Sequence, residues 1–190
     1  PKLAPIQVII LPVKAEEAIN AACQSIADRL NEAGYRVKVD TDDERIGWKS
    51  NKWELRGVPI RVEIGNKELE EGVFTLARRD TDEKERVRIE DAPQKIAQIL
   101  EEIQANLLSQ AETFLQTGTH DITNWEAFKQ QMDGEKGFLK AFWCGKAACE
   151  AQIKEESRAT TRCLAEEGVE GVCIHCGEQA KQKWYFAQSY

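Results

Sequence analysis

The period of hydrophobic and polar positions changes several times along the chain, and each change predicts an element of secondary structure. The continuous apolar run at residues 6–13 is closed by a proline and predicts a strand buried on both faces. Residues 15–33 carry apolar side chains at helical spacing, and Gly34 follows as a typical helix stop. Residues 59–65 alternate cleanly, which predicts a strand with one polar face.

Shorter patterns mark the rest of the first part of the chain. We expect a strand at 36–40, a short helix or structured loop at 44–55, a hairpin of 73–79 with 85–89, and a long helix from 93 to about 115. Strands and helices alternate in this order, which predicts an α/β fold with a mixed sheet covered by helices.

Residues 116–124 contain glycine, threonines and His120, and they predict a boundary between a first domain, 1–116, and a second domain, 117–190. In the second domain we expect helices at 125–132 and around 148–156, and strands near 159–164 and at 183–187. This mixture of short elements predicts a small α+β domain.

Four cysteines in two close pairs, Cys144 with Cys149 and Cys173 with Cys176, predict a metal site in the second domain. Zn²⁺ takes four sulfurs at about 2.3 Å, and short spacings with neighbouring glycines let one turn supply two of them. Four thiolates leave no open position for water or substrate, so a structural site is favoured over a catalytic one. Two disulfides or scattered core cysteines are the alternatives.

Two cysteines and two histidines lie outside this pattern. Cys23 falls on the apolar stripe of 15–33 and is expected in the core, whereas Cys163 alternates with polar residues and is expected on the inward side of a strand. His175 lies between the cysteines of the second pair and is expected to point to solvent. His120 is expected at the surface, and neither histidine has a cysteine or serine partner for nucleophilic catalysis.

Composition narrows the class of protein. The 190 residues are 42% hydrophobic and 31% charged, typical of a soluble globular protein, and there is neither a membrane-spanning run nor a signal peptide. The net charge of −7 argues against a nonspecific nucleic-acid coat, but residues 45–90 carry 11 basic against 10 acidic residues, so a polyanion would prefer this stretch. Cysteines in metal-type pairs suggest a reducing compartment, the cytoplasm. The missing initiator Met suggests that the chain is a fragment or a processed product.

Several blocks in the right order resemble one family over nearly the whole chain. They are Gly47-Trp48-Lys49, then 53–65 (WELRGVPIRVEIG), 75–81 (TLARRDT), 3–8 (LAPIQV), and Trp184-Tyr185-Phe186-Ala187 running to Tyr190. These blocks resemble the anticodon-binding domain and C-terminal end of prolyl-tRNA synthetases, and the cysteine quartet resembles the zinc domain of the archaeal and eukaryotic type. The resemblance implies a three-layer α/β/α anticodon-binding domain followed by a small α+β zinc-binding domain.

The family ligates proline to tRNA with ATP through an amino-terminal catalytic domain that we do not find in this sequence, so the chain is not expected to aminoacylate alone. The implied partners are tRNA(Pro) and the catalytic domain of a parent enzyme, which is expected to be a homodimer. By resemblance, Glu54, Arg61 and Lys67 fall at anticodon-contacting positions, with Arg78 and Lys84 as looser candidates. The carboxylate of Tyr190 is expected to reach toward the catalytic domain.

The chemistry of the anticodon suits two of these residues. Prolyl anticodons share two consecutive guanines; a Glu54 carboxylate can accept from guanine N1–H and N2–H, and Arg61 can donate to O6 and N7. The alternative is that Arg61 is simply the solvent face of a strand and forms a surface ion pair with Glu54, worth under about 1 kcal/mol.

Other residues of this region are expected to have plainer roles. Trp53, and more often than not Trp48, would belong to the core, while Lys49 and Lys52 would be exposed charges. Three positions depart from the family pattern: Ser50 replaces an aromatic residue, which can remove a base-stacking contact worth about 1–3 kcal/mol, and Asn66 and Glu68 replace Pro and Asp of a turn.

Two other functions remain open from the residues alone. The chain can be a structural or interaction module whose zinc domain supports the catalytic domain and dimer of a parent. Less favoured is a thiol redox protein that uses the pair Cys173 and Cys176, since this leaves the other cysteine pair unexplained.

Overall fold

A computed structural model describes residues 1–189 and divides the chain into two compact units, Pro1–Ser109 and Gln110–Tyr190. Tyr190, the predicted contact with a catalytic domain, lies outside the described residues. Within the described part, no helix is both long and apolar enough to cross a bilayer.

The first unit is built on a five-stranded mixed sheet with strand order β2-β1-β3-β4-β5, in which β1 pairs in parallel with β2 and β3 while β4 and β5 are antiparallel additions. The strands are β1 (Val8–Pro12), β2 (Val37–Val39), β3 (Ile60–Ile64), β4 (Val73–Arg78) and β5 (Lys84–Arg88). The helices are α1 (Glu17–Glu32), α2 (Ile46–Leu55), α3 (Asn66–Glu70), a 3₁₀ turn (Ile89–Asp91) and α4 (Ala92–Thr117), whose bounds span the division between the units. The α/β prediction and the order of the expected elements are confirmed; α3 and the 3₁₀ turn were not expected.

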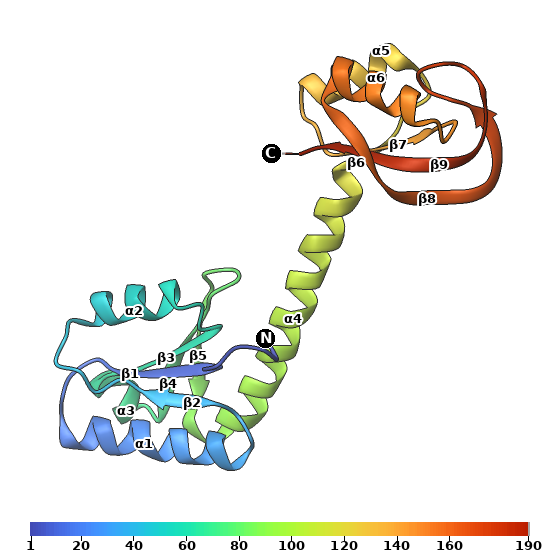
Figure 1. Ribbon diagram of the computed structural model, residues 1–190. Helices are drawn as coiled ribbons and strands as arrows, with labels where there is room; N and C mark the ends of the chain where they lie inside the picture. The colour runs from blue at the N-terminus through green and yellow to red at the C-terminus, as the bar shows by residue number, and fades with distance from the viewer. Residues whose placement is uncertain (190) are drawn as a thin grey trace. The chain divides into compact units, whose positions relative to one another are not determined.

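The sheet of the first unit has helices on both faces, which makes three layers (Figure 1). The main core lies on the face covered by α1 and the first turns of α4, where side chains such as Ile10, Val62 and Leu76 are fully buried. On the other face, Ile9 and Leu11 of β1 pack under α2 against Trp53. Because β1 is buried on both faces, it reads as a continuous apolar run in the sequence.

The second unit contains a four-stranded sheet with order β6-β7-β9-β8 and two helices. Its elements are β6 (Thr119–Asp121), α5 (Trp125–Asp133), β7 (Phe138–Phe142), α6 (Ala147–Ser157), β8 (Ala159–Val172) and β9 (Gln179–Gln188). Its core is separate and gathers apolar side chains of α5, α6 and the central strands, including Phe128, Ile153 and Phe186. The α+β prediction is confirmed, but β6 and β7 were missed, and β8 continues well past the expected end at 164.

The prediction for Cys163 was wrong, because its side chain is exposed. The pairing of β8 with β9 shifts register between Thr161 and Leu164, so a bulge interrupts the alternation on which the prediction rested. Cys23 is buried in α1 as expected, and burial raises the pKa of its thiol to about 12. His120 lies in β6 and is partly buried.

Candidate functional site

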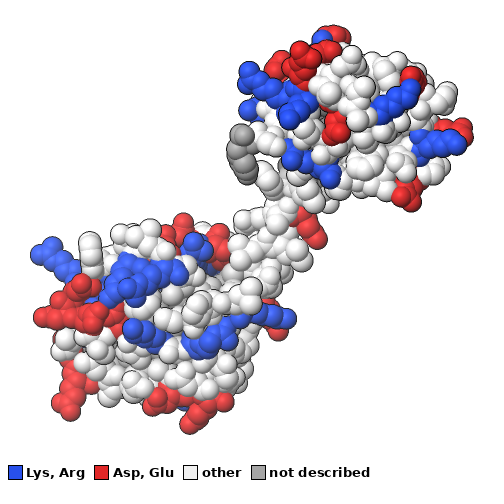
Figure 2. Space-filling view, viewed as in Figure 1, with Lys and Arg blue, Asp and Glu red and all other residues white. Residues whose placement is uncertain are grey.

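A group of charged side chains lies on the sheet of the first unit beside α2. The strand register forms two rows of directly paired residues across β1, β3, β4 and β5. One row is Ile9, Arg61, Ala77 and Lys84, and the other is Leu11, Glu63, Thr75 and Arg86. Directly paired residues point to the same face of a sheet, so these charged side chains share the face on which α2 packs over β1. We call this group, Arg61, Glu63, Lys84 and Arg86, the open sheet face. In Figure 2, basic side chains gather across the middle of the visible face of this unit and acidic ones toward its margins.

Arg61 is held in place by a residue that sequence reasoning did not single out. Its Nε donates to Glu63 Oε1 at 2.7 Å, and Lys84 Nζ lies 3.5 Å from the other carboxylate oxygen. The Arg61 and Glu63 side chains are only 19% and 15% exposed. Since a guanidinium has five N–H donors, the contact through Nε orients Arg61 and leaves its terminal nitrogens for a ligand. Residues two apart on a strand share a face, so the spacing of Arg61 and Glu63 in the sequence could have predicted this contact.

Glu54 and Arg61 line one hollow at the end of α2. Glu54 is exposed in the last turn of α2, and Gly57, with φ +77°, turns the chain back into β3. Arg79 Nε donates to the Glu54 carbonyl at 3.2 Å, which ties this end of α2 to the end of β4. The hollow is lined by Ile9, Trp53, Glu54, Val58, Arg61, Ala77, Arg78, Arg79 and Asp82. Among the described residues Arg61 pairs with Glu63 and not with Glu54, so the alternative of a Glu54–Arg61 ion pair was wrong.

Lys67 is not among the residues that line this hollow. It lies exposed on α3, and α3 packs against α1 and the start of β4. Glu68, one of the departures from the family pattern, accepts from the Gly65 amide at 3.1 Å and caps α3. The other departure in this turn, Asn66, donates to Glu16 Oε1 at 3.3 Å.

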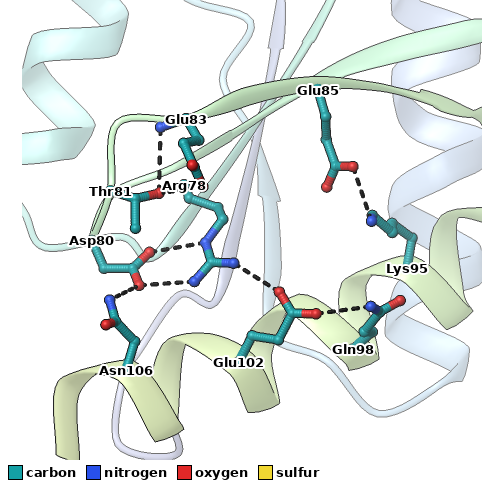
Figure 3. A network of polar contacts seen from close by, with 9 residues as sticks. All are labelled: Arg78, Asp80, Thr81, Glu83, Glu85, Lys95, Gln98, Glu102 and Asn106. Atoms are coloured by element: carbon teal, nitrogen blue, oxygen red, sulfur yellow. Dashed lines mark hydrogen bonds and ion pairs between the residues drawn. The ribbon is translucent and has the colours of Figure 1, made fainter. Parts of the chain in front are cut away.

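The guanidinium nitrogens of Arg78 all donate hydrogen bonds to other residues of the first unit. Its Nε and Nη2 donate to Asp80 at 3.1 and 2.9 Å, and its Nη1 donates to Glu102 of α4 at 2.7 Å. Asn106 donates to the same Asp80 carboxylate at 2.7 Å, so the network in Figure 3 ties the β4–β5 turn to α4. Hydrogen bonds from Arg78 outweigh burial and, with that from Asn106, hold the pKa of Asp80 below its usual value. Arg78 is 13% exposed and its contacts are those of a structural anchor.

The expectation that Lys49 and Lys52 are exposed charges was wrong. Lys49 is buried and donates from Nζ to the Asp40 carbonyl at 3.0 Å, and Lys52 Nζ lies 3.2 Å from the Asp40 carboxylate. Trp53, buried as predicted, donates to that carboxylate through Nε1. Burial opposes ionisation of Asp40, but these donors and the Asp42 amide outweigh it and lower its pKa. Trp48, in contrast, is 62% exposed on α2.

The four predicted metal ligands of the second unit lie together. All four sulfurs are within 4.8 Å of one another, with Sγ distances of 3.6 Å between Cys149 and Cys173 and 3.7 Å between Cys144 and Cys176. Four sulfurs placed tetrahedrally about 2.3 Å from a metal lie about 3.8 Å apart, so the donor set and its spacing fit a metal ion. A disulfide needs about 2.05 Å, and the cysteines are free. The alternatives of two disulfides and of scattered core cysteines were therefore wrong.

The surroundings of one sulfur of the cluster, that of Cys173, favour the thiolate form. Cys173 is buried, which by itself raises its pKa, but the backbone amides of Cys176, His175 and Cys144 donate to it and lower the pKa to about 7. For Cys149, on α6, burial prevails and raises the pKa. A bound cation would reverse the effect of burial, because coordination favours the deprotonated thiolate.

The expectation that His175 points to solvent was wrong. Its side chain is 14% exposed, with Nδ1 3.7 Å from Cys149 Sγ and Nε2 3.1 Å from Glu156 Oε1. A fifth polar side chain therefore lies directly against the cysteine cluster.

Comparisons with known proteins match both parts of the chain. Residues 7–99 match the family model described as an anticodon binding domain, and residues 125–190 match the model for the prolyl-tRNA synthetase C-terminal region. The whole chain is 38% identical to proline–tRNA ligase 2 of Bacillus cereus and 38% identical to a proline–tRNA ligase of Lachnospira eligens, covering 40% of each. A solved prolyl-tRNA synthetase of Cryptosporidium parvum, complexed with L-proline and AMP, superposes over the whole chain with a TM-score of 0.93 at 30% identity, covering 42% of that protein.

The three-layer unit with its open sheet face, followed by a unit with a four-cysteine cluster, defines the anticodon-binding and C-terminal domains of an aminoacyl-tRNA synthetase. The chain belongs to the prolyl-tRNA synthetase family, of which it carries these two domains. It spans about 40% of the length of the curated relatives that it matches.

Proposed function

We propose that this chain recognises the anticodon of tRNA(Pro) as the C-terminal part of a prolyl-tRNA synthetase, an enzyme that ligates proline to tRNA with ATP. The observation that carries the proposal is the hollow at the end of α2, which Glu54 and Arg61 both line and in which Glu63 orients the Arg61 guanidinium. Residues 1–116 would form the anticodon-binding domain and residues 117–190 the C-terminal domain.

The two groups complement guanine. The Glu54 carboxylate accepts from N1–H and N2–H, and the terminal nitrogens of Arg61 donate to O6 and N7 of a guanine unstacked from its neighbours. Lys84 and Arg86 continue the open sheet face and suit phosphate contacts, which position a nucleic acid without reading its sequence. Lys67 on α3 and Arg78 remain proposed contacts, although Arg78 is already engaged by Asp80 and Glu102.

For the second domain we propose a structural Zn²⁺ held by Cys144, Cys149, Cys173 and Cys176. Four sulfurs within 4.8 Å of one another support a tetrahedral thiolate site, and when bound the ion supplies a crosslink between the β7–α6 segment and the β8–β9 turn. Free cysteines support a reducing cytoplasm as the place of action. The catalytic domain of the parent enzyme is the second proposed partner, with Tyr190 as its contact, and the parent is proposed to be a homodimer.

The test is the affinity of the purified chain for tRNA(Pro) and for the same tRNA with its two anticodon guanines replaced. We expect a preference for the guanines that Arg61→Gln reduces by about 1–3 kcal/mol, the usual worth of a bidentate base contact. Lys95→Gln is the matched control, because Lys95 lies on α4, pairs with Glu85 at 2.9 Å, and carries the same charge. A preference that Arg61→Gln leaves intact, or equal affinity of the wild-type chain for both tRNAs, contradicts the proposal.

A further inference from the structure

Three arginines line the hollow at the end of α2, and they differ in whether acidic side chains neutralise their charge. Arg61 pairs with one acidic side chain and Arg78 with two. Arg79 is exposed, and among the residues that the structure describes its guanidinium forms no ion pair. Arg79 is therefore the arginine of this hollow whose positive charge no carboxylate offsets.

The strand register explains why the neighbours Arg78 and Arg79 differ. Arg78 ends β4, and the Arg79 amide continues the ladder by donating to the Pro59 carbonyl at 3.0 Å. Successive residues of a strand point to opposite faces of the sheet. Arg78 therefore turns toward α4, where it meets Glu102 (Figure 3), while Arg79 lies on the side of Ala77, the same side as the open sheet face.

One side-chain contact orients the Arg79 guanidinium and leaves most of its donors unused. Its Nε donates to the Glu54 carbonyl at 3.2 Å, and within the described part of the chain its two terminal nitrogens have no hydrogen-bond partner. The terminal nitrogens of an arginine form a planar fork that donates two parallel hydrogen bonds to a phosphate. A fork held through Nε is oriented in advance for such an anion.

Charge makes a phosphate the suitable ligand for Arg79. Glu54 and Asp82 also line the hollow, and among the described residues neither carboxylate forms an ion pair. A guanine bound by Glu54 brings its negatively charged backbone close to these carboxylates, and like charges repel each other. A cation without a carboxylate partner offsets this repulsion. Phosphate contacts hold a nucleic acid without reading its sequence, so exposed Arg79 suits the backbone, whereas Arg61, oriented by Glu63, suits the base.

We infer that Arg79 is a phosphate-binding residue of the anticodon site: its terminal nitrogens donate to an RNA backbone phosphate beside the guanine that Glu54 and Arg61 bind. The inference rests on the proposed function, and it adds a contact that strengthens binding without selecting the base. The competing explanation is that Arg79 only ties the end of α2 to the end of β4.

Two substitutions separate these explanations. Arg79→Gln removes the charge and the terminal nitrogens but keeps an amide N–H at the position of Nε, so the hydrogen bond to the Glu54 carbonyl can persist. Arg79→Met removes that donor as well. Lys95→Gln controls for the loss of one positive charge, because Lys95 pairs with Glu85, which the register places on the opposite face of the sheet.

The experiment measures the affinity of the full chain for tRNA(Pro), and for the same tRNA with its two anticodon guanines replaced, at several salt concentrations. We expect Arg79→Gln to weaken binding of both tRNAs about five- to tenfold and to leave the preference for the guanines unchanged. The slope of log affinity against log salt should become shallower by about 0.7, the value for one phosphate contact in a single strand. Lys95→Gln should change the affinity by less than about twofold and leave the slope unchanged.

The contacted phosphate can be located from the RNA side. Anticodon stem-loop RNAs are prepared in which one loop phosphate at a time is replaced by an uncharged methylphosphonate. At one position the replacement should weaken binding to the wild-type chain and have little further effect on Arg79→Gln, because two changes that remove the same contact are not additive.

Three results would overturn the inference, and they are distinguishable. If the wild-type chain prefers the guanines and Arg79→Gln matches it in affinity and salt slope, Arg79 binds no phosphate and the proposed anticodon recognition stands. If Arg79→Met loses the preference for the guanines while both variants keep the wild-type salt slope, Arg79 only ties α2 to β4. If the wild-type chain does not distinguish the two tRNAs, the proposed function and the inference fail together.

Discussion

Arg61 and Arg78 are both arginines of the central sheet with less than a fifth of the side chain exposed, but they differ in how many donors are engaged. Arg61 uses Nε on Glu63, whereas Arg78 uses all three nitrogens on Asp80 and Glu102. A guanidinium with unused donors can recognise a base, while a saturated one stabilises its own domain. This difference makes Arg61 the stronger candidate for reading the anticodon.

The Arg78 network predicts a pH-dependent contribution to stability. Replacing Asp80 with Asn removes the charge that Arg78 and Asn106 bind, and we expect the free energy of unfolding to fall by about 1–3 kcal/mol at pH 7. Because Arg78 lowers the pKa of Asp80, this contribution is fully present above the unfolded pKa of about 3.9 and is lost as the pH falls through the folded pKa.

Urea denaturation of wild type and Asp80→Asn at pH 7 and at successively lower pH measures this effect, and the difference should shrink in acid. Asp82→Asn is the control in the same turn. Asp82 is exposed and has φ 58°, a conformation that Asn tolerates, so its substitution should change stability by less than about 0.5 kcal/mol. If the difference in free energy of unfolding between wild type and Asp80→Asn is constant across pH, the ionised Asp80 carboxylate is not the source of this stability.

At the scale of elements, most of the first unit was predictable because its main strands and helices are strongly periodic. β1 reads as an apolar run since both faces are buried, and α1 shows its stripe because one face packs on the sheet. The second unit is harder to predict, since β6 has three residues and β8 is interrupted by register shifts. Short and bulged strands lose the alternation from which a strand is recognised.

The close approach of two backbone segments in the second unit leads to a testable prediction about stability. Gly137 has φ +94°, and a Cβ there would lie 2.3 Å from the Gly118 carbonyl oxygen, while Gly168 has φ +71° and open space around it. Gly168→Ala should cost about 1–3 kcal/mol from backbone strain alone. Gly137→Ala carries the same strain plus a clash with backbone, so its cost should be greater by about 1–3 kcal/mol.

Thermal unfolding of the two glycine variants, followed by circular dichroism, compares these costs directly. Equal destabilisation by Gly137→Ala and Gly168→Ala would mean that the close approach of residues 118 and 137 is not maintained in solution.

At the scale of the whole molecule, the two units have separate hydrophobic cores, and the cysteine cluster belongs to the second. Removal of the proposed metal should therefore weaken one unit and spare the other, because the binding free energy of a structural metal is part of the folding free energy of the domain that holds it. Hydrogen exchange with mass spectrometry, with and without a chelator, locates the effect. We expect protection to fall in residues 110–189 and to persist in β1 and α1.

Two exposed cysteines of the second unit provide matched variants for this experiment. Cys176→Ser removes a proposed ligand and should reproduce the effect of the chelator, whereas Cys163→Ser lies outside the cluster and should bind metal like wild type. Loss of protection throughout both units on chelation, or in neither, would contradict a metal that stabilises only the second unit.

Sequence alone determined the order of elements in the first unit, the α/β and α+β classes, the cysteine quartet and the family. The elements, the classes and the quartet follow from local periodicity and from residue types at fixed spacing, which need no knowledge of distant contacts, whereas the family was identified from the resemblance of several sequence blocks. Only the tertiary structure decided which charges are free. Lys49, Lys52 and Arg78 lie against carboxylate or carbonyl groups, Glu63 orients Arg61, and His175 turns to Cys149. Most of these partners are supplied by strand register and helix packing between distant segments, so local sequence patterns did not reveal them.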